Sequence, residues 1–224
     1  MGHHGPVGHD RALIFDFDGL VIDTEGLYAT TLLHVLAGRG ITTELAAIAH
    51  LFGSTGPENE AAWAEVLAAW GGGLDIDDLD DLIRAHAGTG FDELPVLPGV
   101  LELLDAAEEA GWGTAIATGK ARWRLDEHLA RLGIAERFTV IVTAEEVENG
   151  KPAPDIFLEA ARRLGVDPVA CVVLEDSLPG CQAAHAAGMV AVACPGPVTA
   201  GLEFPPGARR VASLLDVRLD DLAT

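Results

Sequence analysis

Short apolar segments alternate with amphipathic ones, and this alternation constrains the fold more than any other feature of the chain. Five segments are apolar enough to be buried strands: 12–18, 113–118, 139–143, 171–175 and 190–194. Four segments with helical periodicity and a glycine near the end fill the intervals: 99–110, 122–132, 154–164 and 178–187. Near-continuous apolar strands that alternate with helices predict an α/β fold, a Rossmann-like parallel sheet covered on both faces.

The segment between the first two predicted strands has a different character. Residues 23–92 contain helical patterns and no convincing strand, and Trp63, Val66, Leu67 and Trp70 recur on one helical face. Such a stripe is typical of residues that pack a small helical bundle. We therefore expect a helical cap domain at 23–92, inserted into an α/β core domain made of residues 1–22 and 93–224.

Composition excludes several classes of partner. The formal net charge is −21, from 35 acidic and 14 basic side chains, which repels nucleic acids and anionic membranes. The chain has no apolar run near the roughly 20 residues of a membrane span. The N-terminal MGHHGPVGHD lacks an apolar signal segment and is expected to be a leader outside the fold.

The cysteines indicate the cellular compartment of the protein. The cysteines Cys171, Cys181 and Cys194 are odd in number and show no metal-ligand spacing, as suits a reducing compartment. We expect a cytoplasmic protein that is a monomer or a weak homodimer.

Chemically active side chains follow the ends of the predicted strands, where open parallel sheets bind ligands. In chain order, these strand ends supply Asp16 and Asp18, Thr118 and Gly119, Lys151, and Glu175 and Asp176. Carboxylates at close quarters repel one another, and each ionised one in a partly dry site carries a desolvation cost. A divalent cation relieves both problems, and oxygen ligands with room for water and a phosphate favour Mg²⁺. We therefore expect Mg²⁺ as the cofactor.

The pair of aspartates suggests phosphoryl transfer. Asp16, beside the cation, can attack phosphorus to give an aspartyl-phosphate. Asp18 can then protonate the leaving alcohol and later deprotonate the attacking water. The groups expected to bind the phosphoryl oxygens are Thr118, Lys151 and the backbone N–H groups near Gly19 and Gly119. Each residue alone also fits a turn or a cap, but together they indicate one site.

These motifs resemble a known family. DFDGLVIDTE, ATGK, GKPAPDIF and EDSLPGCQAAHAAGM resemble the four motifs of the haloacid dehalogenase-like hydrolase superfamily, over residues 11–215. The helical insert resembles the C1 cap of its subfamily I. The resemblance implies that Asp16 and Asp18 are the nucleophile and the general acid/base. It also implies a metal held by Asp16, by the Asp18 carbonyl and by Asp176, with Glu175 adjacent.

Within this superfamily, two features narrow the reaction. Haloacid dehalogenases lack the second aspartate, so Asp18 favours phosphoryl transfer over cleavage of a carbon–halogen bond. Phosphonoacetaldehyde hydrolases need a cap lysine, and this chain has no lysine before Lys120.

The chain is similar to the β-phosphoglucomutase and sugar-phosphate phosphatase group, whose mutases typically carry a histidine where Tyr28 stands. DTEGLY also resembles the DTEPLW-like run of the sugar-phosphate phosphatases, whose aromatic residue faces the substrate. The resemblance makes Tyr28 a candidate substrate contact from the cap, with packing inside the cap as the alternative. Residues 22–92 hold twelve acidic side chains against Arg39 and Arg84, which suits a bisphosphate badly. We expect a phosphatase acting on a small phosphorylated metabolite, such as a sugar phosphate. A phosphomutase and a catalytically inert phospho-ligand binding module remain the alternatives.

Overall fold

A six-stranded parallel sheet forms the centre of the protein, in the order β3-β2-β1-β4-β5-β6. The computed structural model describes residues 9–53, 57–71, 73 and 75–222, so His3 and His4 of the expected leader lie outside it. The strands are β1 (Ala12–Phe15), β2 (Gly113–Thr118), β3 (Val140–Thr143), β4 (Cys171–Glu175), β5 (Val190–Ala193) and β6 (Arg209–Arg210). The predicted Rossmann-like fold is confirmed.

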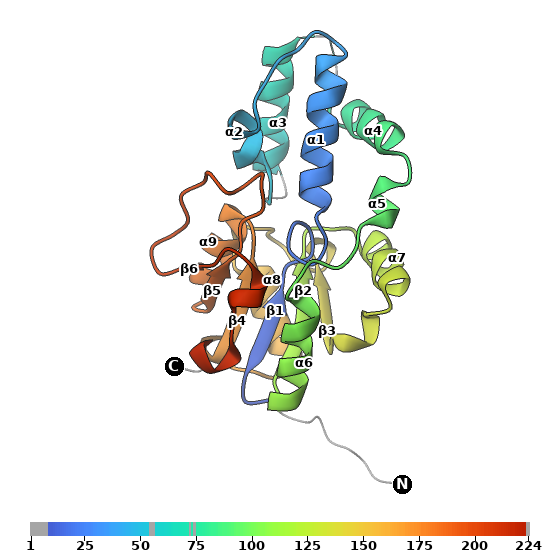
Figure 1. Cartoon of the computed structure of the whole chain (residues 1–224). Coiled ribbons are helices and arrows are strands. Elements are labelled where there is room, and N and C mark those ends of the chain that lie inside the picture. The colour runs from blue at the N-terminus through green and yellow to red at the C-terminus, as the bar shows by residue number, and fades with distance from the viewer. Residues whose placement is uncertain (1–8, 54–56, 72, 74, 223–224) are drawn as a thin grey trace.

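Helices cover both faces of the sheet (Figure 1). On one face, α6 (Val100–Ala110) and α7 (Arg122–Leu132) pack on Phe15, Ile116 and Leu174. On the other, α8 (Asp155–Leu164) and α9 (Leu178–Ala186) pack on Ile14 and Val173. All four helices lie within one residue of their predicted bounds. No described helix is long and apolar enough to cross a membrane.

β1 and β6 differ most from the prediction, whereas the other strands lie within one residue of their predicted bounds. β1 ends at Phe15 rather than at residue 18, because the chain turns away from the sheet once the Asp16 N–H has bonded to Leu174 at 2.9 Å. Gly19, with a φ of +79°, allows this turn. β6 was missed, since two residues carry no periodic signal.

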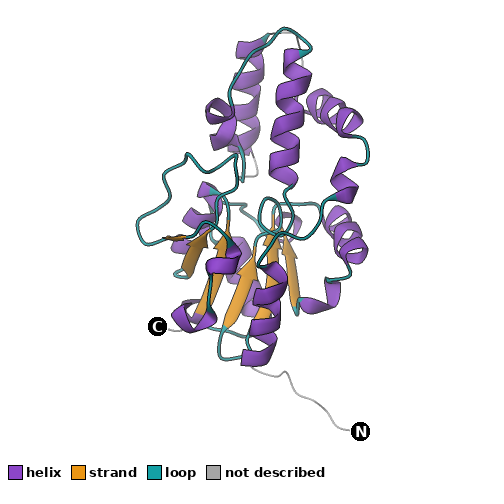
Figure 2. Ribbon diagram, viewed as in Figure 1, coloured by secondary structure: helices purple, strands orange, loops and turns teal. Residues whose placement is uncertain are grey.

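The described part of residues 23–92 is helical, as predicted. Its helices are α1 (Thr24–Ala37), α2 (Leu45–Ile48), α3 (Pro57–Trp70), α4 (Ile76–Ala87) and α5 (Gly90–Glu93), with a short 3₁₀ turn at Ala49–Leu51. Trp63 and Leu67 are buried with Leu32 and Leu79 in a separate apolar cluster, so the expected stripe is a packing face. These helices lie beyond the arrowhead ends of the strands (Figure 2). The two-domain division itself stays a prediction.

Candidate active site

The register of the central strands brings the predicted site residues to one edge. β1 pairs with β2 on one side and with β4 on the other, and Phe15 lies opposite both Ile116 and Leu174. The residues that follow these positions therefore converge. Asp16, Thr118 and Glu175 lie at the carboxyl ends of three adjacent strands, as the sequence predicts for an open parallel sheet.

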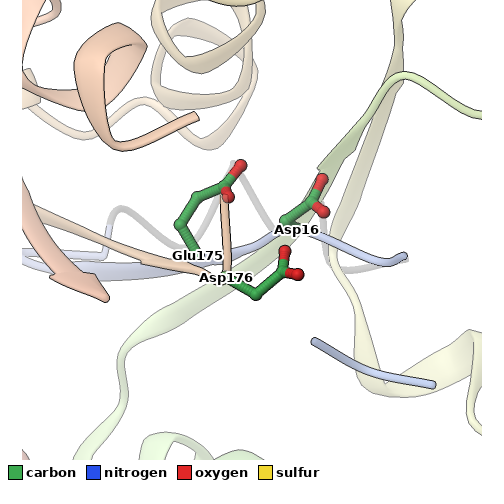
Figure 3. A group of neighbouring side chains, drawn as sticks. All are labelled: Asp16, Glu175 and Asp176. Carbon is green, nitrogen blue, oxygen red and sulfur yellow. The ribbon is translucent and has the colours of Figure 1, made fainter. Parts of the chain in front are cut away.

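Three carboxyl groups form a buried cluster at this edge. Asp16, Glu175 and Asp176 each offer one oxygen, and these oxygens lie within 4.8 Å of one another. The residues are 6%, 0% and 1% exposed. Figure 3 shows their side chains reaching into a common space from the ends of neighbouring strands. In the described residues, no other group of three or more acidic, histidine or cysteine side chains is arranged to hold a metal ion.

Lys151 joins two of these carboxylates. Its Nζ donates to Asp16 Oδ1 at 2.5 Å and to Glu175 Oε1 at 2.6 Å, and the residue is 4% exposed. The other oxygen of Glu175 accepts from Ser177 N at 2.9 Å and from Ser177 Oγ at 2.7 Å. A Cβ at Gly180 would lie 1.7 Å from Glu175 Oε1, so only glycine leaves the space that this carboxylate occupies.

The cluster carries more negative charge than its surroundings neutralise. Burial raises the pKa of Asp16 to about 7; Lys151 opposes this rise and Glu175 adds to it. Burial, followed by repulsion from Glu25, raises the pKa of Asp176 well above its ordinary value. Although burial disfavours a charged lysine, Asp16 and Glu175 raise the pKa of Lys151, which stays protonated.

Asp18 lies outside the carboxylate cluster. Its Oδ1 accepts from Thr24 Oγ1 at 2.5 Å and pairs with Lys120 Nζ at 2.7 Å. The sequence analysis assigned Lys120 no role in the site, so this ion pair was missed. Lys120 was detectable as the second of only two lysines, directly after Gly119. Its backbone N–H also donates to Thr118 Oγ1 at 3.1 Å, which fixes the hydroxyl.

Gly19 shapes the loop after β1. Its N–H donates to the carbonyl of Ile22 at 2.8 Å. A Cβ there would lie 2.1 Å from Asp176 Oδ2, so the absence of a side chain makes room for that carboxylate.

A cavity of about 350 Å³ opens above the cluster. Asp16, Asp18, Thr118, Gly119 and Lys151 lie in its wall on the core side. The opposite wall comes from the inserted helices and their flanking loops and is largely apolar: Tyr28, Leu51, Phe52, Trp63, Ile76 and Phe91. Seven charged or titratable residues that the sequence analysis did not place in the site also line it: Glu25, Arg84, Asp92, Lys120, Arg124, Glu127 and His128.

Tyr28 belongs to this apolar wall. Its ring packs edge-on against Phe52, with centroids 6.1 Å apart, and Phe52 packs in the same way against Trp63. Burial raises the pKa of Tyr28, so its hydroxyl stays protonated and can act as a donor. Tyr28 therefore lies where a substrate bound in the cavity could contact it, and its role as a substrate contact stays a prediction.

The residues of the cluster fit a divalent cation. Asp176 Oδ1 is buried and has no hydrogen-bond partner. The available ligands are carboxylate oxygens, which hard cations such as Mg²⁺ prefer. Their excess negative charge is the kind of arrangement that a bound cation stabilises.

Comparison with known proteins identifies the family of the chain. Residues 13–194 match the family described as haloacid dehalogenase-like hydrolase. The fructose-1-phosphate phosphatase YqaB of Escherichia coli is 37% identical over 186 residues, which cover 80% of this chain and 94% of the relative. Hexitol phosphatase B of the same organism is 31% identical over 189 residues, covering 83% of this chain and 84% of the relative.

A solved structure is similar over nearly the whole chain. CbbY from Rhodobacter sphaeroides, in complex with xylulose-(1,5)bisphosphate, matches with a TM-score of 0.74 and 28% identity. The match covers 96% of this chain and 99% of that one. The family match spans most of the sequence and includes both the β1 loop and the segment that carries Glu175 and Asp176. The chain is therefore an enzyme that belongs to the haloacid dehalogenase-like hydrolase family.

Proposed function

We propose that the enzyme is a Mg²⁺-dependent phosphatase that hydrolyses a small phosphorylated metabolite through an aspartyl-phosphate on Asp16. One observation supports this most strongly. Asp16 lines the cavity and lies among Lys151, Glu175 and Asp176 at the carboxyl edge of the sheet. One substrate phosphate in the cavity could thus contact the nucleophile Asp16 and the ammonium group of Lys151, beside the carboxylates that would bind the metal.

Asp16, Asp176 and the Asp18 carbonyl would hold the cation, with Glu175 beside them. When bound, Mg²⁺ would offset negative charge on the phosphoryl group and keep Asp16 ionised although burial raises its pKa. Lys151 would then hold both Asp16 and a phosphoryl oxygen. Thr118, Gly119 and the loop around Gly19 would bind the other phosphoryl oxygens.

The reaction would proceed in two displacements at phosphorus. A carboxylate oxygen of Asp16 forms a bond to phosphorus while the bond to the leaving alcohol breaks, and Asp18 gives that alcohol its proton. Water then attacks the phosphorus of the aspartyl-phosphate and gives a proton to Asp18. This step releases inorganic phosphate and regenerates Asp16. Thr24 and Lys120 hold Asp18 Oδ1 and so orient the carboxyl group for both transfers.

The cavity supports a small substrate. A space of about 350 Å³ accommodates a phosphate and a short or single-ring alcohol, consistent with a sugar phosphate. The relatives named fructose-1-phosphate phosphatase and hexitol phosphatase, which align with 80% and 83% of this chain, also support a sugar phosphate as substrate. The helices α1 to α5 would act as the cap that covers the substrate and excludes bulk water. We propose that the enzyme is cytoplasmic, a location that suits its three free cysteines. We also propose that it is a monomer or a weak homodimer.

A phosphomutase is the second candidate. Arg84 of α4 and Arg124 of α7 line the same cavity as Lys151 and could hold a second phosphate. Arg84, however, is paired with Asp80 at 2.6 Å. Its positive charge is therefore partly neutralised, which favours hydrolysis over transfer between two phosphate positions.

The test is Asp16→Asn, compared with wild type on a panel of sugar phosphates with Mg²⁺. We expect wild-type release of inorganic phosphate, and loss of turnover by at least about a thousandfold in the variant because its nucleophile is gone. Asp77→Asn, at an exposed position on α4, makes the same charge change as a control and should keep its activity. Substantial turnover by Asp16→Asn would contradict the proposal. Isomer conversion with little free phosphate would indicate the mutase, and inactivity of wild type on every ester the inert module.

A further inference from the structure

Two buried oxygens are left without a partner at the start of the first inserted helix. Among all buried side-chain nitrogens and oxygens of the described residues, only Glu25 Oε2 and Asp176 Oδ1 lack a hydrogen-bond partner. Glu25 lies in the first turn of α1 and lines the same cavity as Asp16, and its negative charge contributes to the raised pKa of Asp176. Asp176 is 1% exposed, so water does not readily compensate its charge.

The positions of the two lysines explain why Glu25 and Asp176 have no cationic partner. Five carboxylates gather around the site: Asp16, Asp18, Glu25, Glu175 and Asp176. Lys151 pairs with Asp16 and Glu175, and Lys120 pairs with Asp18. No ion pair to Glu25 or Asp176 is present in the described part of the chain, and both face further carboxylates. The negative charge that the chain leaves uncompensated is therefore concentrated on this pair.

We propose that Glu25 is a fourth carboxylate of the cation site and strengthens Mg²⁺ binding from the side of Asp176. This inference rests on the proposed function, because it requires the cation that the phosphatase mechanism uses. Glu25 is not among the three residues whose oxygens lie within 4.8 Å of one another. Glu25 would therefore contribute through its charge and by accepting a hydrogen bond from a water held by the ion, the kind of outer contact that sets metal affinity.

The position of Glu25 also connects the inserted helices to the core. The first turn of α1 sets Thr24 against Asp18 and Glu25 against Asp176. A cation bound there would relieve the repulsion between Glu25 and Asp176, and so stabilise the start of α1 against the sheet edge. An ordinary helix-terminal role is already filled by Asp23, which caps α1 by accepting from Gly26 N at 2.9 Å.

The experiment is a titration of Mg²⁺ into metal-free protein by isothermal calorimetry, without substrate. We expect Glu25→Gln to bind Mg²⁺ roughly ten- to a hundredfold more weakly than wild type. Glu65→Gln, which removes the same charge from an exposed position on α3, should bind Mg²⁺ within about twofold of wild type. Thermal unfolding without Mg²⁺ checks folding, and Glu25→Gln should be at least as stable as wild type because it loses an unpaired buried charge.

The outcomes separate this inference from the function on which it rests. If Glu25→Gln binds Mg²⁺ as tightly as wild type does, the proposed role of Glu25 is overturned. The same holds if the variant raises only the KM for substrate and leaves the Mg²⁺ affinity unchanged. An equal loss of affinity in Glu65→Gln would also overturn it, because the effect would then be that of net charge. If the wild-type protein does not bind Mg²⁺ at millimolar concentration, the Mg²⁺ dependence in the proposed function is contradicted.

Discussion

Replacing Gly180 by alanine should dislodge Glu175 from the site. Gly180 lies in the first turn of α9, where alanine would ordinarily stabilise the helix by up to about 1 kcal/mol. A Cβ there, however, would lie 1.7 Å from Glu175 Oε1 and 1.9 Å from its carboxyl carbon. Real Cβ contacts essentially never fall under 3.0 Å, so the carboxyl group must move by at least about 1.3 Å.

The size of the effect follows from the bonds that hold this carboxylate. It accepts from Lys151 at 2.6 Å and from Ser177 at 2.9 and 2.7 Å, and a shift of about 1.3 Å breaks at least two of these bonds. Hydrogen bonds to a charged group contribute about 1.5–3 kcal/mol each. After the helix gain is subtracted, Gly180→Ala should lose about 2–5 kcal/mol of unfolding free energy.

Equilibrium urea unfolding measures this loss directly. Gly201→Ala is the matched control, because a Cβ there meets no atom within 4 Å and needs no left-handed backbone. The control should unfold within about 0.5 kcal/mol of wild type. A Gly180→Ala protein as stable as wild type would refute the view that the packing of α9 fixes Glu175.

Two further substitutions test other parts of the site and the core. Thr24→Val removes the hydroxyl that donates to Asp18 at 2.5 Å; kcat should fall about tenfold with little change in KM, and an unchanged kcat would count against this orienting role. Burial raises the pKa of Glu146, but hydrogen bonds from Arg163 and Thr143 outweigh it and hold the pKa below 4.5. The resulting stabilisation is complete above about pH 4.5 and is lost as the pH falls through the folded-state pKa. Glu146→Gln should therefore be less stable at pH 7 and show a shallower acid dependence in thermal unfolding, and an unchanged acid slope would contradict the assignment.

The strands and the four core helices were predictable because each carries a simple periodic signal. Buried parallel strands are apolar throughout, and glycines such as Gly111 and Gly133 end helices in a left-handed conformation. Parallel strands also place their carboxyl ends at one edge. The sequence pattern alone therefore predicts that Asp16, Thr118 and Glu175 lie together.

The pairing within the site was less predictable. Which carboxylate Lys151 or Lys120 contacts depends on rotamers and on the turn after β1, and neither leaves a pattern in the sequence. Glu25 was missed for a similar reason. Its place beside Asp176 depends on the angle at which α1 leaves the β1 loop, which residue spacing does not specify.

The central claim is that Asp16 receives the phosphoryl group, and rapid acid quench followed by peptide mass spectrometry tests it most directly. Enzyme mixed with Mg²⁺ and a turned-over sugar phosphate should yield a phosphorylated peptide spanning residues 11–25, with the modification on Asp16. The modified peptide should form no more slowly than free phosphate appears. Turnover with no phosphorylated peptide at any quench time, or with phosphate on another residue, would contradict the account.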